Sequence, residues 1–176
     1  MIKAISWNCR GLGSRHKISL IHDLIKEENP QILLLQETKK KDTNILQDSS
    51  YIWRACKGVA ISARGTSGGI RTLWNPNIFS LQSWHSTMHW IKTSLLHLPT
   101  GKILTVINVY MPAMYQEKID CWSSLQNLQG SLELEDLIIV GDLNTKLHPK
   151  AKKRGFSSTG PHPRASRGSY ILLPLT

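Results

Sequence analysis

The chain has 176 residues, of which 40% are hydrophobic, and a formal net charge of +10. This length and composition suit one packed core, and the longest apolar runs are far shorter than the roughly 20 residues that a membrane-spanning helix needs. The three cysteines, Cys9, Cys56 and Cys121, lie far apart with no histidine at zinc-ligand spacing, which argues against a disulfide framework and a zinc site. We therefore expect a soluble intracellular monomer, nuclear or cytoplasmic, with no disulfide partner and no membrane association.

The first half of the chain alternates between predicted strands and helices. Residues 2–8 alternate apolar and polar side chains, which predicts a strand. Residues 17–28 carry Ile18, Ile21 and Ile25 at helical spacing, and the Asn-Pro pair that follows predicts the helix end. Residues 32–37 are apolar until the last two positions and predict a second strand.

The middle of the chain predicts consecutive antiparallel strands separated by Gly, Pro and Ser turns. These strands are expected at residues 51–54, 59–63, 70–74, 79–84 and 90–98. Four tryptophans lie in this part: Trp53, Trp74, Trp84 and Trp90. Stacking on unpaired bases is one use for such residues, but their alternating placement favours packing in the core.

Two further strands and one helix follow. Residues 102–110 predict a strand that Pro112 ends, because proline has no N–H to donate to a ladder. Residues 115–128 place Ile119, Trp122 and Leu125 on one helix face. Residues 137–140 form a short apolar run that stops at Gly141, which predicts a strand buried on both faces.

Four of the predicted strands end in polar side chains. In chain order these are Asn8, Glu37, Tyr110, and Asp142 with Asn144. Mg²⁺ prefers carboxylate and amide oxygens and keeps several water molecules for substrate phosphates. The set therefore suggests transfer of a phosphoryl group to water, although Asp142 and Asn144 taken alone are better explained by an ordinary Asx turn.

Five short motifs occur in an order that resembles the endonuclease/exonuclease/phosphatase superfamily. They are Ser6-Trp7-Asn8-Cys9-Arg10-Gly11, Gln36-Glu37-Thr38, Ser67-Gly68-Gly69, Asn108-Val109-Tyr110-Met111-Pro112 and Gly141-Asp142-Leu143-Asn144. The order is most similar to the apurinic-endonuclease-type domain of LINE-type (non-LTR) retrotransposons. Each motif is weak alone, but five in sequence are a strong indication.

The resemblance implies a role for each strand-end residue. Asn8 and Glu37 would lie at the metal ion, Mg²⁺ or alternatively Mn²⁺. Tyr110 would contact the scissile phosphate, Asp142 would position or deprotonate the attacking water, and Asn144 would steady the developing charge.

The likeness also implies a nucleic-acid partner, most simply DNA. Arg10 and Lys146 are the basic residues beside the motifs that we consider for contacts with it.

The end of the chain departs from the family pattern. The family completes its site with a further aspartate and a Ser-Asp-His motif, but no acidic residue follows Asp142 here, and His148 and His162 lie in no matching motif. Seven of the 22 Lys and Arg residues follow Thr145. Such a basic segment attracts any polyanion without sequence preference, and a solvated linker explains it equally well.

We accordingly divide the chain at residue 150. Residues 1–150 are expected to form a partial domain of this family, and residues 151–176 a basic tail containing Gly, Ser and Pro, disordered because it cannot bury enough apolar surface. The closing apolar residues 170–175 are expected to have no partners.

The expected fold is α/β: two packed mixed β-sheets flanked by helices, a four-layer sandwich that is incomplete at its C-terminal end. The expected function is that of a Mg²⁺-dependent DNA endonuclease that is weakened or inactive because the C-terminal Asp/His part of the site is missing. The alternatives are a catalytically dead remnant that binds nucleic acid non-specifically and a phosphatase of the same fold.

Overall fold

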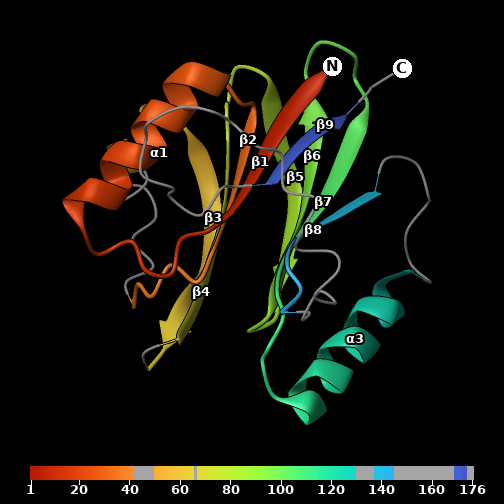
Figure 1. Cartoon of the computed structure of the whole chain (residues 1–176). Coiled ribbons are helices and arrows are strands. Elements are labelled where there is room, and N and C mark those ends of the chain that lie inside the picture. The colour runs from red at the N-terminus through yellow and green to blue at the C-terminus, as the bar shows by residue number, and fades with distance from the viewer. Residues whose placement is uncertain (42–49, 66, 130–136, 145–168, 174–176) are drawn as a thin grey trace, which may run out of the picture.

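Two β-sheets pack face to face, with one helix on each outer side (Figure 1). The computed structural model describes residues 1–41, 50–65, 67–129 and 137–144, and the backbone of residues 169–173. The first sheet has the order β3-β4-β2-β1-β9, with strands β1 (Ile2–Asn8), β2 (Ile32–Gln36), β3 (Lys57–Arg64), β4 (Ser67–Trp74) and β9 (Ser169–Leu173). The second has the order β5-β6-β7-β8, with strands β5 (Phe79–Ser86), β6 (Trp90–His97), β7 (Ile103–Tyr110) and β8 (Leu137–Asp142). The helices are α1 (Arg15–Glu28) and α3 (Tyr115–Gln129).

Three apolar clusters hold the four layers together. The central cluster lies between the sheets and includes Ile32, Leu34 and Leu95. A second cluster packs Ile21 of α1 against the outer face of the first sheet, and a third packs Leu125 of α3 against the second sheet. Both sheets are mixed, because β1–β2 and β7–β8 are parallel pairs while the other pairs are antiparallel. The predicted four-layer α/β sandwich is confirmed.

Helix α1 begins and ends at residues whose chemistry explains its limits. The Ser14 side chain accepts a hydrogen bond from the Lys17 N–H at 3.3 Å, which caps the first turn. At the other end Asn29 adopts a left-handed conformation with φ of 44°, and Pro30 prevents continuation. Helix α1 covers its sheet with one face only. None of the described helices is both long and apolar enough to span a membrane.

Two expectations about the middle of the chain are corrected. The strand predicted at residues 51–54 is wrong, because residues 50–52 form a helical turn and the Cys56 N–H closes the next turn on the Trp53 carbonyl at 3.2 Å. The predicted burial of tryptophans holds for Trp74 and Trp90, each 2% exposed, but not for Trp84, which is 48% exposed. Trp84 lies on β5, which in the described part of the chain is an edge strand with β6 as its one neighbouring strand.

Strand β8 is less buried than its sequence predicts. Among its residues only Val140 is buried, and Ile139 is 41% exposed. The reason is the strand order, since β8 is the last strand after β7 in the described part of the second sheet. An apolar run of this kind does not distinguish an edge strand from a central one.

The chain end also departs from expectation. Residues 169–173 form β9, which pairs antiparallel with β1 and places Ile171 opposite Ala4, so the expectation that the closing apolar residues have no partners is wrong for this segment. The edge of β1 away from β2 offers backbone N–H and C=O groups for such pairing. Residues 145–168 and 174–176 lie outside the described residues, and the division into a domain at 1–150 and a disordered tail at 151–176 stays a prediction.

Candidate functional site

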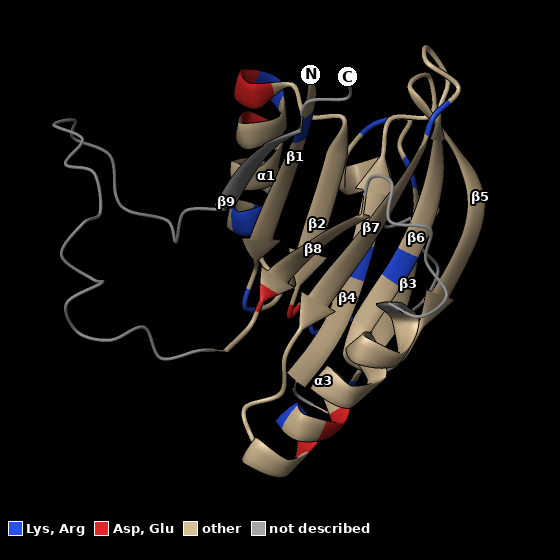
Figure 2. Ribbon diagram, turned by 90° about the vertical axis from the view of Figure 1, so that its right-hand side faces the viewer, with Lys and Arg blue, Asp and Glu red and all other residues tan. Residues whose placement is uncertain are grey.

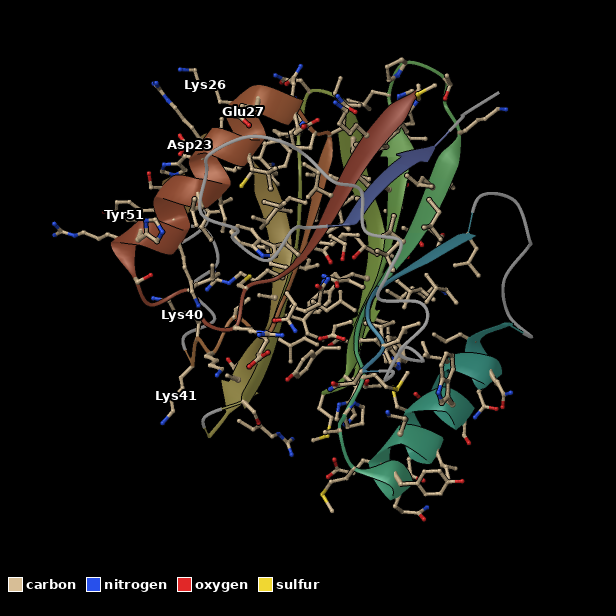
Figure 3. The ribbon with its side chains drawn as sticks, in the orientation of Figure 1. Asp23, Lys26, Glu27, Lys40, Lys41 and Tyr51 are labelled. Atoms are coloured by element: carbon tan, nitrogen blue, oxygen red, sulfur yellow. The ribbon has the colours of Figure 1, made fainter. Side chains whose placement is uncertain are left out.

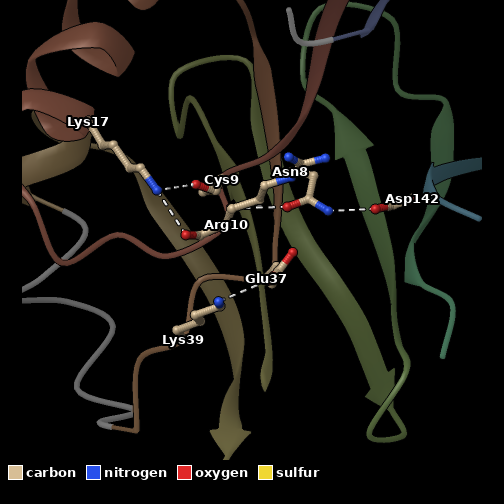
Figure 4. Close-up of polar contacts among 7 residues, drawn as sticks. All are labelled: Asn8, Cys9, Arg10, Lys17, Glu37, Lys39 and Asp142. Atoms are coloured by element: carbon tan, nitrogen blue, oxygen red, sulfur yellow. Dashed lines mark hydrogen bonds and ion pairs between the residues drawn. The ribbon is translucent and has the colours of Figure 1, made fainter. Parts of the chain in front are cut away.

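The ends of four strands, two from each sheet, meet at one edge of the sandwich. The parallel pairing of β1 and β2 sets Asn8 beside Gln36, and that of β7 and β8 sets Tyr110 beside Asp142. The Asn8 amide Nδ2 donates a hydrogen bond to Asp142 Oδ2 at 2.5 Å, which connects the two sheets directly (Figure 4). Residues 134 positions apart in the sequence are thus in contact at the site.

Glu37 follows β2 on a strained stretch of backbone. It adopts a φ of 52°, which is uncommon for a residue other than glycine, and its carbonyl accepts the Gly11 N–H at 2.7 Å. Its side chain is 17% exposed, and one carboxylate oxygen lies 3.1 Å from Lys39 Nζ (Figure 4). The backbone therefore holds Glu37 next to the loop that follows Asn8.

The pKa of the Tyr110 hydroxyl depends on both carboxylates of the site, those of Glu37 and Asp142. Burial raises the pKa of its hydroxyl above the usual value, and the negative charges of Glu37 and Asp142 raise it further. The phenol therefore stays protonated at neutral pH and can donate a hydrogen bond. All three side chains are close enough to interact electrostatically.

Gly141 allows strand β8 to lie close to β7 at the site. Its φ is +148°, and a Cβ atom at this position would lie 1.9 Å from the Val109 carbonyl oxygen. The turn after it fixes Asp142, whose Oδ1 accepts the Asn144 N–H at 2.9 Å, so the Asx-turn interpretation of this motif also holds. The Asn144 side chain donates to the Met111 carbonyl at 2.9 Å, and its own carbonyl accepts Lys118 Nζ at 2.9 Å.

A buried polar network, which no sequence pattern predicted, lies between the two sheets beneath the site. Gln36 Nε2 donates to Asn108 Oδ1 at 2.6 Å and to Ser6 Oγ at 3.0 Å. Asn108 Nδ2 in turn donates to the Arg71 carbonyl at 2.9 Å and lies 3.3 Å from Thr72 Oγ1. Gln36 and Asn108 both belong to the motifs quoted above. Gln36 directly precedes Glu37 and Asn108 lies two residues before Tyr110, and this position is the one sequence signal that could have indicated a role. The network ties the sheets together beneath the carboxylates.

Basic residues frame the site on the α1 side. Arg10 is exposed, and its backbone N–H donates to Asn8 Oδ1 at 3.0 Å. Lys17 Nζ binds the Cys9 and Arg10 carbonyls at 2.9 and 2.8 Å, which fixes this loop (Figure 4). Burial raises the pKa of the Cys9 thiol to about 12, so Cys9 is a packing residue and not a nucleophile. Lys146 lies outside the described residues.

The carboxylates at the site are set apart from the other acidic residues. Figure 2 shows acidic residues gathered on α1 and α3. Among the described residues, Glu37 and Asp142 are the only acidic residues that lie outside these two helices. Both have protein partners at the strand ends, since Glu37 pairs with Lys39 and Asp142 accepts hydrogen bonds from Asn8 and Asn144.

The donor chemistry of the site fits Mg²⁺. In the described part of the chain, no three His, Cys, Asp or Glu side chains form a group that could hold a metal ion by themselves. Mg²⁺, however, is usually bound through one or two carboxylates with water and substrate phosphate completing its shell. Glu37 supplies such a carboxylate, and Asn8 Oδ1 keeps a second lone pair after it accepts the Arg10 N–H. The metal-binding and catalytic roles predicted for the five strand-end residues stay predictions.

Solved structures with this fold include nucleases and phosphatases. The chain is similar to an AP endonuclease from Archaeoglobus fulgidus (21% identity, TM-score 0.67, covering 85% of this chain and 60% of that one). It is also similar to the endonuclease domain of TRAS1, a telomere-specific non-LTR retrotransposon (13% identity, TM-score 0.62, covering 84% and 61%). A third similar structure is a mannosyl-6-phosphatase from Bacteroides thetaiotaomicron (12% identity, TM-score 0.66, covering 85% and 68%).

These likenesses show the fold and not the substrate. The chain spans 60% of the length of the AP endonuclease and 61% of that of the TRAS1 domain. No curated protein matches its sequence. The family model of the endonuclease/exonuclease/phosphatase family matches residues 5–171, which is nearly the whole chain. The chain therefore belongs to the endonuclease/exonuclease/phosphatase family.

Proposed function

We propose that the chain hydrolyses phosphodiester bonds of nucleic acid, DNA first, in a reaction that depends on Mg²⁺. The observation that carries the proposal is the hydrogen bond between Asn8 and Asp142, which brings the ends of β1 and β8 together next to Glu37 and Tyr110. Phosphoryl transfer asks a protein mainly to position the reactants and to stabilise charge, and this set of residues suits both tasks.

Each residue has a task that its surroundings support. Asp142 is fixed by hydrogen bonds from the Asn8 side chain and the Asn144 N–H, so its carboxyl group can orient a water molecule and accept its proton. Tyr110 stays protonated and can donate to a phosphate oxygen. Mg²⁺ bound to Glu37 and Asn8 would supply Lewis-acid stabilisation of the charge on the phosphate.

Asn144 has a structural task beside the one that its motif implies. The structure uses its side chain to hold the Met111 carbonyl and its N–H to hold Asp142. We infer that Asn144 keeps the general base in place, in addition to any contact of its amide with the developing charge.

The activity of these 176 residues alone should be low. No acidic residue occurs among residues 143–176, so the aspartate and the acid-supported histidine of the family pattern have no counterpart there. Removing one preorganised donor to a transition state typically costs about a hundred- to a thousandfold in rate. We therefore propose a weakened enzyme. Binding of nucleic acid without cleavage is the second candidate, favoured by the same sequence observation.

Nicking of supercoiled plasmid tests the proposal. We expect slow, EDTA-sensitive nicking in Mg²⁺ that Glu37→Ala and Asp142→Asn abolish. Glu27→Ala is the matched control, because Glu27 is an exposed acid on α1 away from the site (Figure 3). Nicking that survives both site substitutions would refute the assignment. Mg²⁺-dependent nicking as fast as that of the TRAS1 endonuclease domain, lost in Glu37→Ala, would refute the weakening.

A further inference from the structure

A groove of about 760 Å³ opens beside Tyr110. Its walls include residues 67–69 at the start of β4, residues 86–89 from the end of β5 to the turn before β6, and residues 112–114 between β7 and α3. Glu117, in the first turn of α3, closes one side. The volume lies within the range of small-molecule binding sites, which is about 300 to 1,000 Å³.

The groove is continuous with the candidate site. Tyr110 lines the groove and also interacts with the carboxylates of Glu37 and Asp142. The Tyr110 N–H donates to the His89 carbonyl at 2.8 Å, so the groove wall and the site share a backbone contact. A phosphodiester held at Tyr110 would therefore extend its next sugar and base toward this groove.

The groove walls suit a flat organic ring. Met88 and Met114 are 44% and 67% exposed, and Ile61, Pro112 and Ala113 add further apolar surface. Methionine side chains are flexible and polarizable, and they make favourable contacts with aromatic rings. Two exposed methionines that line one groove can therefore pack against the face of a nucleobase.

The charges in the groove disfavour a second phosphate. Glu117 and Arg64 are its acidic and basic members among the described residues, so the lining has no net positive charge. Burial lowers the pKa of His89, which keeps its ring neutral at pH 7, and the Glu117 carboxylate acts on it in the opposite direction. Glu117 and His89 line the same groove, and a carboxylate there can accept a hydrogen bond from a neutral donor such as an amino group.

We propose that this groove binds the nucleoside next to the scissile phosphate and that Glu117 accepts a hydrogen bond from an exocyclic amino group of its base. The inference rests on the proposed function and adds a base preference to it: cytosine, adenine or guanine over thymine at this position. Carboxylates recognise the cytosine amino group in the same way in other nucleic-acid complexes.

Titration of the whole chain with deoxycytidine, followed by ¹H–¹⁵N NMR spectra, tests the inference. We expect the amide signals of residues 67–69 and 87–89 to shift, and the dissociation constant to rise at least about fivefold in Glu117→Ala, the lower limit for loss of one specific base contact. Glu27→Ala is the matched control and should bind as the wild type does. Thymidine should bind more weakly than deoxycytidine and should be insensitive to Glu117→Ala.

A second variant keeps the test decisive if Glu117→Ala disturbs α3. Met114 is largely exposed, so Met114→Ala should leave the fold intact and weaken both nucleosides. Absence of shifts in the groove, or unchanged affinity in Glu117→Ala and Met114→Ala, would overturn the inference. The nucleosides carry no phosphate and the titration contains no metal, so its outcome is independent of plasmid nicking and separates this inference from the proposed function.

Discussion

Gly141 shows how one residue without a side chain can decide the geometry of a site. β8 approaches β7 so closely at this point that the Val109 carbonyl occupies the place of a Cβ atom. The carboxylate that follows is thereby brought opposite Tyr110. The glycine of the Gly-Asp-Leu-Asn motif is thus a structural requirement of the site, whatever the reaction.

Gly141→Ala should therefore destabilise the fold. The overlap with Val109 and the unfavourable φ together predict a loss of about 2 to 4 kcal/mol in the free energy of unfolding. Gly13→Ala is the control, because nothing lies within 4 Å of a Cβ atom there, and it should change stability by less than about 0.5 kcal/mol. Urea unfolding of both variants measures this, and equal midpoints would contradict the account.

Tyr110 offers a pH-dependent readout of the same site. Its pKa is raised, so the protonated phenol stabilises the folded state at pH values below the usual pKa of 10, and this contribution is lost as the pH rises through the folded-state pKa. Glu37→Gln removes one of the charges responsible and should lower the Tyr110 pKa. The measurement is an absorbance titration of tyrosinate, with Tyr110→Phe subtracted to isolate this residue. A Tyr110 pKa that Glu37→Gln does not lower would show that the two side chains do not interact.

At the scale of elements, the hydrogen bonds of Asn108 with Gln36 and with the Arg71 carbonyl connect the two sheets beneath the site. Asn108→Ala would remove this partner from the buried Gln36 amide and from the Arg71 carbonyl, which predicts a loss of about 1 to 3 kcal/mol in stability. Asn127→Ala on the exposed face of α3 is the matched control and should be neutral or slightly stabilising. Thermal or urea unfolding distinguishes them, and an equally small effect of both substitutions would contradict a structural role for the network.

Local patterns predicted some elements better than others, for physical reasons. The spacing of apolar residues and the Asn-Pro pair predicted helix α1 correctly. A run of β-branched residues followed by a proline predicted strand β7. The error at residues 51–54 arose because a short segment with one buried isoleucine fits a helical turn as well as a strand. Burial of β8 and of Trp84 was misjudged because strand order, which decides what is an edge, does not follow from local sequence.

At the scale of the molecule, motif order predicted the four-layer sandwich and brought Asn8 and Asp142 to one place across 134 residues of sequence. It could not predict the pairing of β9 with β1, since composition suggested a solvated tail and pairing depends on an open sheet edge elsewhere in the chain. The hydrogen bonds between the sheets and the groove beside Tyr110 could not be predicted from the sequence for a similar reason. They arise from residues that only the packing of two sheets brings together.

The central claim is that the strand ends form one metal-dependent site, and binding of Mn²⁺ in place of Mg²⁺ tests it most directly. The electron paramagnetic resonance signal of free Mn²⁺ reports how much ion the protein removes from solution. We predict one bound ion per chain, an affinity at least about tenfold lower in Glu37→Gln, as expected for loss of a metal ligand, and no change in Glu27→Gln. Equal affinity for Mn²⁺ in the wild type and in Glu37→Gln would contradict the claim.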